Sequence, residues 1–176
     1  GEVYKRQPIP RTLAMTVYGS LETSVIDELP PGRNPVQTSS RPDSLRDKVI
    51  KRVEEVCVTG KRAYWVCTLI EDSEELEAQS AEELFKEISQ SLPKLKVGLV
   101  HGRLKKDEKD SVIEKFRKGD IQLLVCTTVI EVGVDVPDAT LMIIENPERL
   151  GLSQLHQLRG RVGRKANTES HCLLLY

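Results

Sequence analysis

The residues in this sequence best suited to chemistry form a run of arginines near its carboxyl end. Arg159, Arg161 and Arg164 fall within six residues, two glycines separate them, and the stretch 149–165 contains no acidic residue. A guanidinium group is a rigid, permanently charged fork that suits phosphate oxygens, and it is almost never buried without a partner. The run therefore indicates either a phosphate-binding site or the solvated end of a basic helix.

A loop of three polar or small residues is a second candidate. His101, Gly102 and Arg103 follow an apolar run at 96–100. Gly102 allows close approach of the backbone, and the side chains on either side of it can donate hydrogen bonds. A capped loop with incidental polar residues remains the other interpretation of this segment.

A third candidate is the loop 127–137, which follows the next apolar run. Thr127 and Thr128 can offer hydroxyl and N–H groups to a phosphate backbone. Gly133, with Asp135 two residues later, could bring the backbone close to a nucleotide and a carboxylate to a ribose hydroxyl. Taken alone, this pattern is also weak.

The segments that must position these loops alternate between strands and helices. Helical spacing and amphipathic patterns predict helices at 44–58, around 84–92, at 106–118 and over the arginine run. Short apolar runs predict strands at 63–70, 96–100, 121–126, 140–145 and 171–175. Such alternation predicts an open α/β fold, a parallel sheet with helices on both faces, of the P-loop or doubly wound type. In these sheets functional groups gather at the carboxyl ends of the strands.

Residue types at the helix ends support these boundaries. Asp43 is expected to be the N-cap of the first helix and Ser153 that of the last. Gly119 is expected to end the helix at 106–118.

Prolines set the expected domain boundary. Six of them lie between positions 8 and 42, a density that excludes a long helix or a central strand. We therefore expect residues 1–42 to form an interdomain arm, in which only 11–26 could hold a short element. The regular domain is expected at 43–176.

Composition is that of an ordinary globular protein with uneven charge. The net charge is −1, yet residues 71–90 carry eight acidic side chains and one lysine. Local patches would therefore decide any binding to a polyanion. The four cysteines have no metal-ligand spacing, which predicts reduced core residues and a cytoplasmic location. No apolar run is long enough to span a membrane.

Some nucleotide-binding features are missing from the sequence. It contains no G-x-x-x-x-G-K-[ST] loop and no Asp-Glu pair at a strand end that could hold Mg²⁺. The chain thus has arginines suited to a nucleoside triphosphate without the means to hold one alone. This combination predicts one half of an active site.

The sequence resembles the superfamily 2 helicases. Residues 127–135 look like helicase motif V, and 157–164 look like motif VI. The similarity runs from about Pro8 to Tyr176 and is greatest to the bacterial helicases that branch-migrate DNA junctions. Its most specific part is Q-L-H-Q-L-R-G-R-V-G-R, which also occurs in the transcription-repair coupling factor. Other matching segments are 8–15, 27–33, 63–70 and 144–164.

The resemblance implies that 43–176 is the second RecA-like motor domain of a helicase that hydrolyses ATP with Mg²⁺. Arg161 and Arg164 would be arginine fingers and Gln157 would support the γ-phosphate. The implied nucleotide contacts are Gly133 and Asp135, and the implied DNA contacts are Thr127, Thr128, His101, Gly102 and Arg103. Arg159 matches no fixed basic position in the superfamily.

The implied partners are branched or forked DNA and the first motor domain and wedge domain of the same polypeptide. Residues 1–7 do not match the family and are expected to be non-native or disordered. A fragment of this kind is predicted to be inactive alone. The alternatives are the equivalent domain of the transcription-repair coupling factor and a non-catalytic α/β module that uses 159–165 only as a basic patch.

Overall fold

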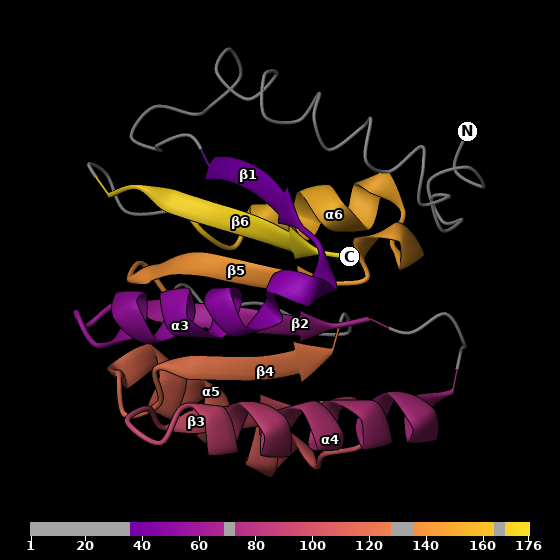
Figure 1. Cartoon of the computed structure of the whole chain (residues 1–176). Helices are drawn as coiled ribbons and strands as arrows, with labels where there is room; N and C mark the ends of the chain where they lie inside the picture. The colour runs from indigo at the N-terminus through magenta and orange to yellow at the C-terminus, as the bar shows by residue number, and fades with distance from the viewer. Residues whose placement is uncertain (1–35, 69–72, 128–135, 164–167) are drawn as a thin grey trace.

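The computed structural model describes residues 36–68, 73–127, 136–163 and 168–176. Within these residues, six parallel strands form one sheet in the order β1-β6-β5-β2-β4-β3 (Figure 1). The strands are β1 (Val36–Arg41), β2 (Arg62–Cys67), β3 (Val97–Val100), β4 (Leu123–Thr127), β5 (Ala139–Glu145) and β6 (Ser170–Leu175). The parallel α/β sheet expected from the alternating pattern is confirmed.

Helices cover both faces of the sheet (Figure 1). They are α3 (Arg46–Cys57) and α4 (Glu74–Ser91) on one face, and α5 (Lys106–Lys118) and α6 (Leu152–Arg159) on the other. Ala63 and Trp65 of β2 belong to the core under α3 and α4, whereas Tyr64 and Val66 belong to the core under α5 and α6. Because neither face is solvated, successive strand residues are all apolar, and the strand lacks an alternating pattern.

The first strand lies inside the segment that the sequence assigned to an arm. Strand β1 pairs with β6, from Val36 opposite Ser170 to Arg41 opposite Leu175. It is the last strand at one end of the described sheet, where flanking prolines are tolerated. The sheet therefore begins at Val36, one strand earlier than the expected boundary at Asp43. The remaining arm, with the expectations for 1–7 and 11–26, lies outside the described residues.

The two predicted N-caps are wrong. A short 3-10 turn, η1 (Asp43–Leu45), precedes α3, and the Asp43 side chain accepts a hydrogen bond from Arg46 instead of capping the helix. Helix α6 begins at Leu152, so Ser153 lies inside it, and the N–H of Gly151 donates to the side chain of Gln154 at 3.2 Å. In both cases the chain enters the helix through a turn that the cap residue alone does not reveal.

Other local predictions are confirmed. Helix α5 has the predicted bounds, and Gly119 follows it in the left-handed region at φ 94°. All four cysteines are buried free thiols, as expected for small core residues. No helix in the described part of the chain is long and apolar enough to cross a membrane.

Candidate functional site

The carboxyl ends of the parallel strands lie along one edge of the sheet, which we call the carboxyl edge (Figure 1). Thr68 follows β2, His101 follows β3, Thr127 ends β4 and Asn146 follows β5. The candidate loops of the sequence therefore start from the same edge, the usual place for ligand sites in such folds.

The arginine run divides into residues with different environments. Arg159 is only 7% exposed, and its Nη2 donates to the carbonyl of Val36 in β1 at 3.1 Å. Burial lowers the pKa of Arg159, because the charged form loses its hydration. Arg159 thus ties α6 to the edge strand of the sheet. It does not belong to a solvated basic patch, which disfavours the polyanion-binding alternative.

Arg161 lies just beyond α6 and is half-buried. Burial raises the pKa of the Cys126 thiol, and the positive charge of Arg161 acts in the opposite direction. Cys126 is the second-last residue of β4, so this interaction agrees with a position of Arg161 toward the carboxyl edge. Gln157 lies on the exposed side of α6. Arg164 lies outside the described residues.

Among the three predicted site residues in the loop after β3, only Arg103 is exposed. His101 is 5% exposed, accepts a hydrogen bond at Nδ1 from the N–H of Arg103, and has Nε2 3.4 Å from the Glu82 carboxylate of α4. Its ring is therefore buried against α4. The Gly102 carbonyl accepts from Lys109 at 3.4 Å. The Arg103 side chain is 53% exposed, so it is the group of this loop best placed to meet a ligand.

The loop after β4 is described only at its start. Thr127 is 1% exposed, so its hydroxyl faces the interior, and the structure does not favour it as a DNA contact. Thr128, Gly133 and Asp135 lie outside the described residues.

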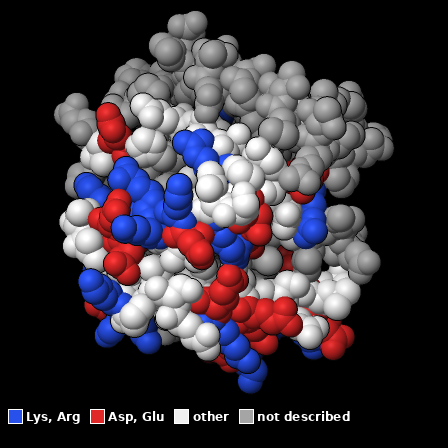
Figure 2. Space-filling view, in the orientation of Figure 1, with Lys and Arg blue, Asp and Glu red and all other residues white. Residues whose placement is uncertain are grey.

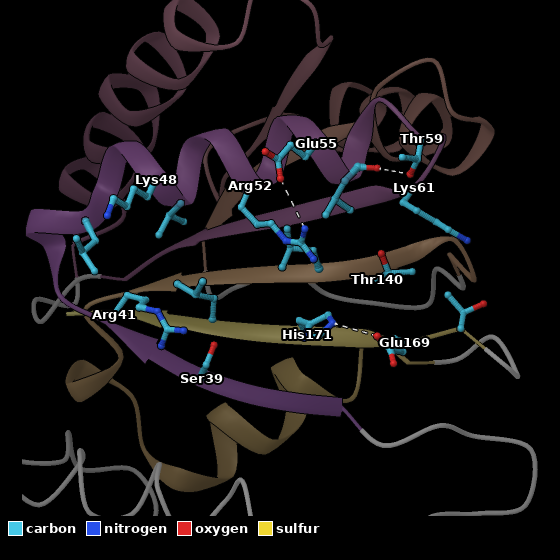
Figure 3. Close-up of a pocket in the computed structure, with 16 residues that line it drawn as sticks. Ser39, Arg41, Lys48, Arg52, Glu55, Thr59, Lys61, Thr140, Glu169 and His171 are labelled. Atoms are coloured by element: carbon cyan, nitrogen blue, oxygen red, sulfur yellow. Dashed lines mark hydrogen bonds and ion pairs between the residues drawn. The ribbon is translucent and has the colours of Figure 1, made fainter.

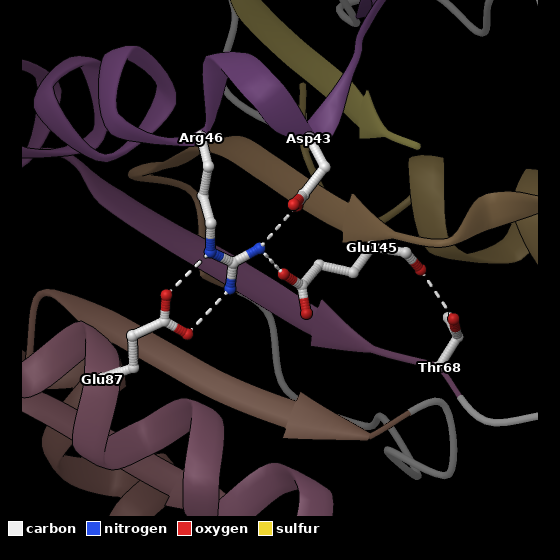
Figure 4. Close-up of polar contacts among 5 residues, drawn as sticks. All are labelled: Asp43, Arg46, Thr68, Glu87 and Glu145. Carbon is white, nitrogen blue, oxygen red and sulfur yellow. Dashed lines mark hydrogen bonds and ion pairs between the residues drawn. The ribbon is translucent and has the colours of Figure 1, made fainter.

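A cluster that the sequence did not reveal supports the carboxyl edge (Figure 4). Arg46, at the start of α3, hydrogen-bonds to Glu145 at the end of β5 and to both carboxylate oxygens of Glu87 in α4, at 2.8 and 3.0 Å. It also contacts Asp43 at 3.1 Å and lies over the ring of Trp65. Burial raises the pKa of Glu145, and Arg46 opposes that rise. This cluster joins three elements where the sheet ends.

A hollow of about 700 Å³ lies over the sheet between α3 and strands β5, β6 and β1 (Figure 3). Arg52 pairs with Glu55 at 3.6 Å there, and His171 lies 3.9 Å from Glu169. Its other basic residues are Arg41, Lys48 and Lys61. None of the predicted site residues lines it, so it is separate from the arginine run.

The face that carries α3 and α4 has an uneven charge distribution (Figure 2). Acidic side chains gather over α4, whereas both signs alternate over α3. The inner side of α4 packs Leu84 and Ile88 into the core. Its acidity is therefore that of a solvated helix face.

Residues 46–166 match the family described as the helicase conserved C-terminal domain. The chain belongs to this helicase family. The resemblance to superfamily 2 helicases is therefore confirmed.

Relatives of the helicase family match almost the whole chain. The ATP-dependent DNA helicase RecG of Escherichia coli strain K12 is 66% identical over 170 residues, which are 96% of this chain and 24% of that protein. RecG of Thermotoga maritima is 49% identical over 174 residues, 98% of this chain and 22% of the relative. The chain thus spans about a quarter of the length of these curated relatives.

Solved helicase structures share the fold. A structure of RecG bound to a three-way DNA junction superposes with a TM-score of 0.69 at 47% identity, over 96% of this chain and 22% of that chain. Domain 2 of the DEAD-box helicase Mss116p, bound to an RNA duplex, superposes with a TM-score of 0.59 at 18% identity, over 78% of this chain and 53% of the other. The second match shows the fold alone, and together they confirm the RecA-like architecture.

Proposed function

We propose that this chain is the second motor domain of an ATP-dependent DNA helicase that remodels stalled forks and branched DNA in recombination and repair. The observation that carries the proposal is its 66% identity to E. coli RecG across 96% of the chain. The RecG structure that superposes on it was bound to a three-way junction, the class of DNA proposed here. A first motor domain and a wedge domain of the same polypeptide would complete the enzyme, which we place in the cytoplasm.

ATP with Mg²⁺ would lie between the two motor domains, and the residues at the carboxyl edge fit such a ligand. Arg161 is half-buried, and its positive charge acts on Cys126 near the end of β4, toward this edge. ATP supplies the phosphoryl group that is transferred to water, and the first motor domain would hold most of it together with the metal. This chain would supply positive charge from the opposite side.

The proposed roles of individual residues follow the resemblance to the helicase motifs. Arg161 and Arg164 would stabilise the charge that develops on the transferred phosphoryl group, and a finger of this kind contributes about 10³–10⁵ in rate. Gln157, exposed on α6, would support the γ-phosphate. Gly133 and Asp135 would contact the nucleotide.

The DNA contacts would come from the loops after β3 and β4. Arg103 has the strongest support because its side chain is exposed. His101 and Thr127 are buried, so their contribution would be to hold the loops of Gly102 and Thr128 in place.

The test is DNA-stimulated ATP hydrolysis by the whole protein carrying Arg161→Ala or Arg164→Ala. We expect each change to lower kcat by at least about 10³-fold, the lower bound for a finger. Arg52→Ala is the matched control, because among the described residues Arg52 forms its ion pair with Glu55, in the hollow that none of the predicted site residues lines. Undiminished turnover in both finger variants would show that the arginine run has another purpose. The chain alone is predicted not to hydrolyse ATP.

A further inference from the structure

Two residues that the proposed mechanism does not use join the end of β2 to the turn that leads into α6. Thr68 is 2% exposed, and its hydroxyl lies 2.6 Å from the carbonyl oxygen of Glu145 and 3.0 Å from that of Asn146 (Figure 4 shows the first contact). In the opposite direction, Nη1 of Arg149 donates to the carbonyl oxygen of Thr68 at 2.9 Å. The two side chains thus form a reciprocal clamp between the β2 end and the β5–α6 turn.

The clamped turn has an unusual backbone conformation. Asn146 lies in the left-handed region at φ 46° and ψ 56°, which a residue other than glycine rarely adopts. Its N–H donates to the carbonyl of Leu175 at 2.8 Å, and its own carbonyl accepts from the N–H of Arg149 at 3.0 Å. The short helix η2 (Pro147–Arg149) follows, and α6 begins at Leu152. The geometry of this turn therefore sets the origin of α6.

Helix α6 is only eight residues long, and Arg161 lies two residues beyond it. A displacement at the start of so short a helix is carried to its end, where the proposed finger lies. Misplacing a reacting group by about 1 Å can cost about 10²-fold in rate. The clamp also fixes the turn relative to β2, whose other neighbour in the sheet, β4, carries the loop that begins at Thr127.

We propose that Thr68 and Arg149 are positioning residues that hold α6 so that Arg161 reaches the phosphoryl group. The inference rests on the proposed function of the arginine run. A residue that only stabilised the fold would change the folded fraction. A residue that positions the finger lowers kcat while KM for ATP stays nearly constant, because the finger contact strengthens in the transition state.

The experiment uses the whole protein with Thr68→Val, which keeps the side-chain shape and removes the hydroxyl donor. We expect kcat for DNA-stimulated ATP hydrolysis to fall about 10- to 100-fold, with KM for ATP unchanged within about twofold. Thr68→Ser restores the hydroxyl and should restore kcat. Thr59→Val is the matched control, because the Thr59 hydroxyl also donates to a carbonyl, that of Val56 at 2.6 Å, at the opposite edge of the sheet.

Arg149→Met tests the second half of the clamp and decides the matter if Thr68→Val does not fold. It should show the same loss of kcat at constant KM. Three results would overturn the proposal. The folded variants could keep a kcat within about twofold of wild type, their activity could fall only as much as the amount of folded protein falls, or the change could be confined to KM. Arg161→Ala in the same assay separates the two proposals. If Arg161→Ala is inactive and the clamp variants are active, only the positioning role fails; if Arg161→Ala is active, the proposed function of the run fails as well.

Discussion

Replacing Arg46 with methionine should destabilise the chain far more than the same change at Arg52. Both arginines lie on α3 and both contact glutamate, but their surroundings differ. The side chains of Arg46 and Glu145 are 19% and 14% exposed, whereas those of Arg52 and Glu55 are 57% and 54% exposed. The comparison therefore contrasts a buried ion-pair cluster with an exposed ion pair.

The loss in the free energy of unfolding depends on which charges each substitution leaves without a partner. Removing one partner of a buried pair costs about 3–5 kcal/mol, because the other charge stays buried without compensation. Glu87, the second partner of Arg46, is 48% exposed and can be rehydrated, which reduces the cost. Loss of the cation–π contact with Trp65 adds about 0.5–1 kcal/mol. The two adjustments act in opposite directions, so we expect the free energy of unfolding to fall by about 3–5 kcal/mol for Arg46→Met and by less than about 1 kcal/mol for Arg52→Met.

Urea unfolding followed by circular dichroism measures both changes, and pH adds a second readout. Burial raises the pKa of Glu145, and the positive charge of Arg46 opposes this rise. Arg46→Met removes the opposing charge, so the pKa of Glu145 rises further. The ionised carboxylate destabilises the fold above its folded-state pKa. As pH falls through that value, the carboxyl group is protonated and the penalty recedes. The deficit of Arg46→Met relative to wild type should therefore be smaller at pH 5 than at pH 7.

A matched second substitution sharpens this test. Glu145→Gln added to Arg46→Met should recover part of the lost stability, because it removes the uncompensated charge. Equal losses at Arg46 and Arg52, or a deficit that grows on acidification, would refute the reasoning.

Two further predictions concern backbone strain and thiol reactivity. Gly119→Ala should lose about 1–2 kcal/mol of stability, because Gly119 has a left-handed backbone. The loss should be greater than that of Gly60→Ala, although Gly60 also has a positive φ. A Cβ at Gly119 would lie 2.7 Å from Nη2 of Arg62, whereas a Cβ at Gly60 would have nothing within 4 Å. Equal losses in thermal unfolding would show that the Arg62 contact adds nothing. Burial raises the pKa of Cys67 to about 11 and that of Cys57 to about 12, so about 0.1% or less of either thiol is ionised at pH 8. The native chain should therefore react with Ellman's reagent far more slowly than the urea-unfolded chain, and rapid native labelling would contradict the burial of the thiols.

The sequence predicted the central strands because burial on both faces leaves a continuous apolar run. All five residues of β4 are buried, and six of the seven in β5. Strand β1 was missed because it lies at the end of the sheet. Its residues, V-Q-T-S-S-R, are mostly polar, and only two of the six are buried. An end strand needs little apolar surface, so its pairing with β6 is visible only in three dimensions.

Helical periodicity separates the buried arginine of the arginine run from the others. Leu155, Leu158 and Arg159 occupy positions i, i+3 and i+4 of α6, so helical periodicity alone places Arg159 on the buried side. Gln157 falls on the other side, and Arg161 lies beyond the helix end, where the periodicity no longer applies. The Arg46 cluster has no such signal, because its partners Glu87 and Glu145 lie 41 and 99 residues away. Local periodicity can thus separate a buried arginine from a candidate finger, whereas an ion-pair network that joins three elements depends on the completed sheet.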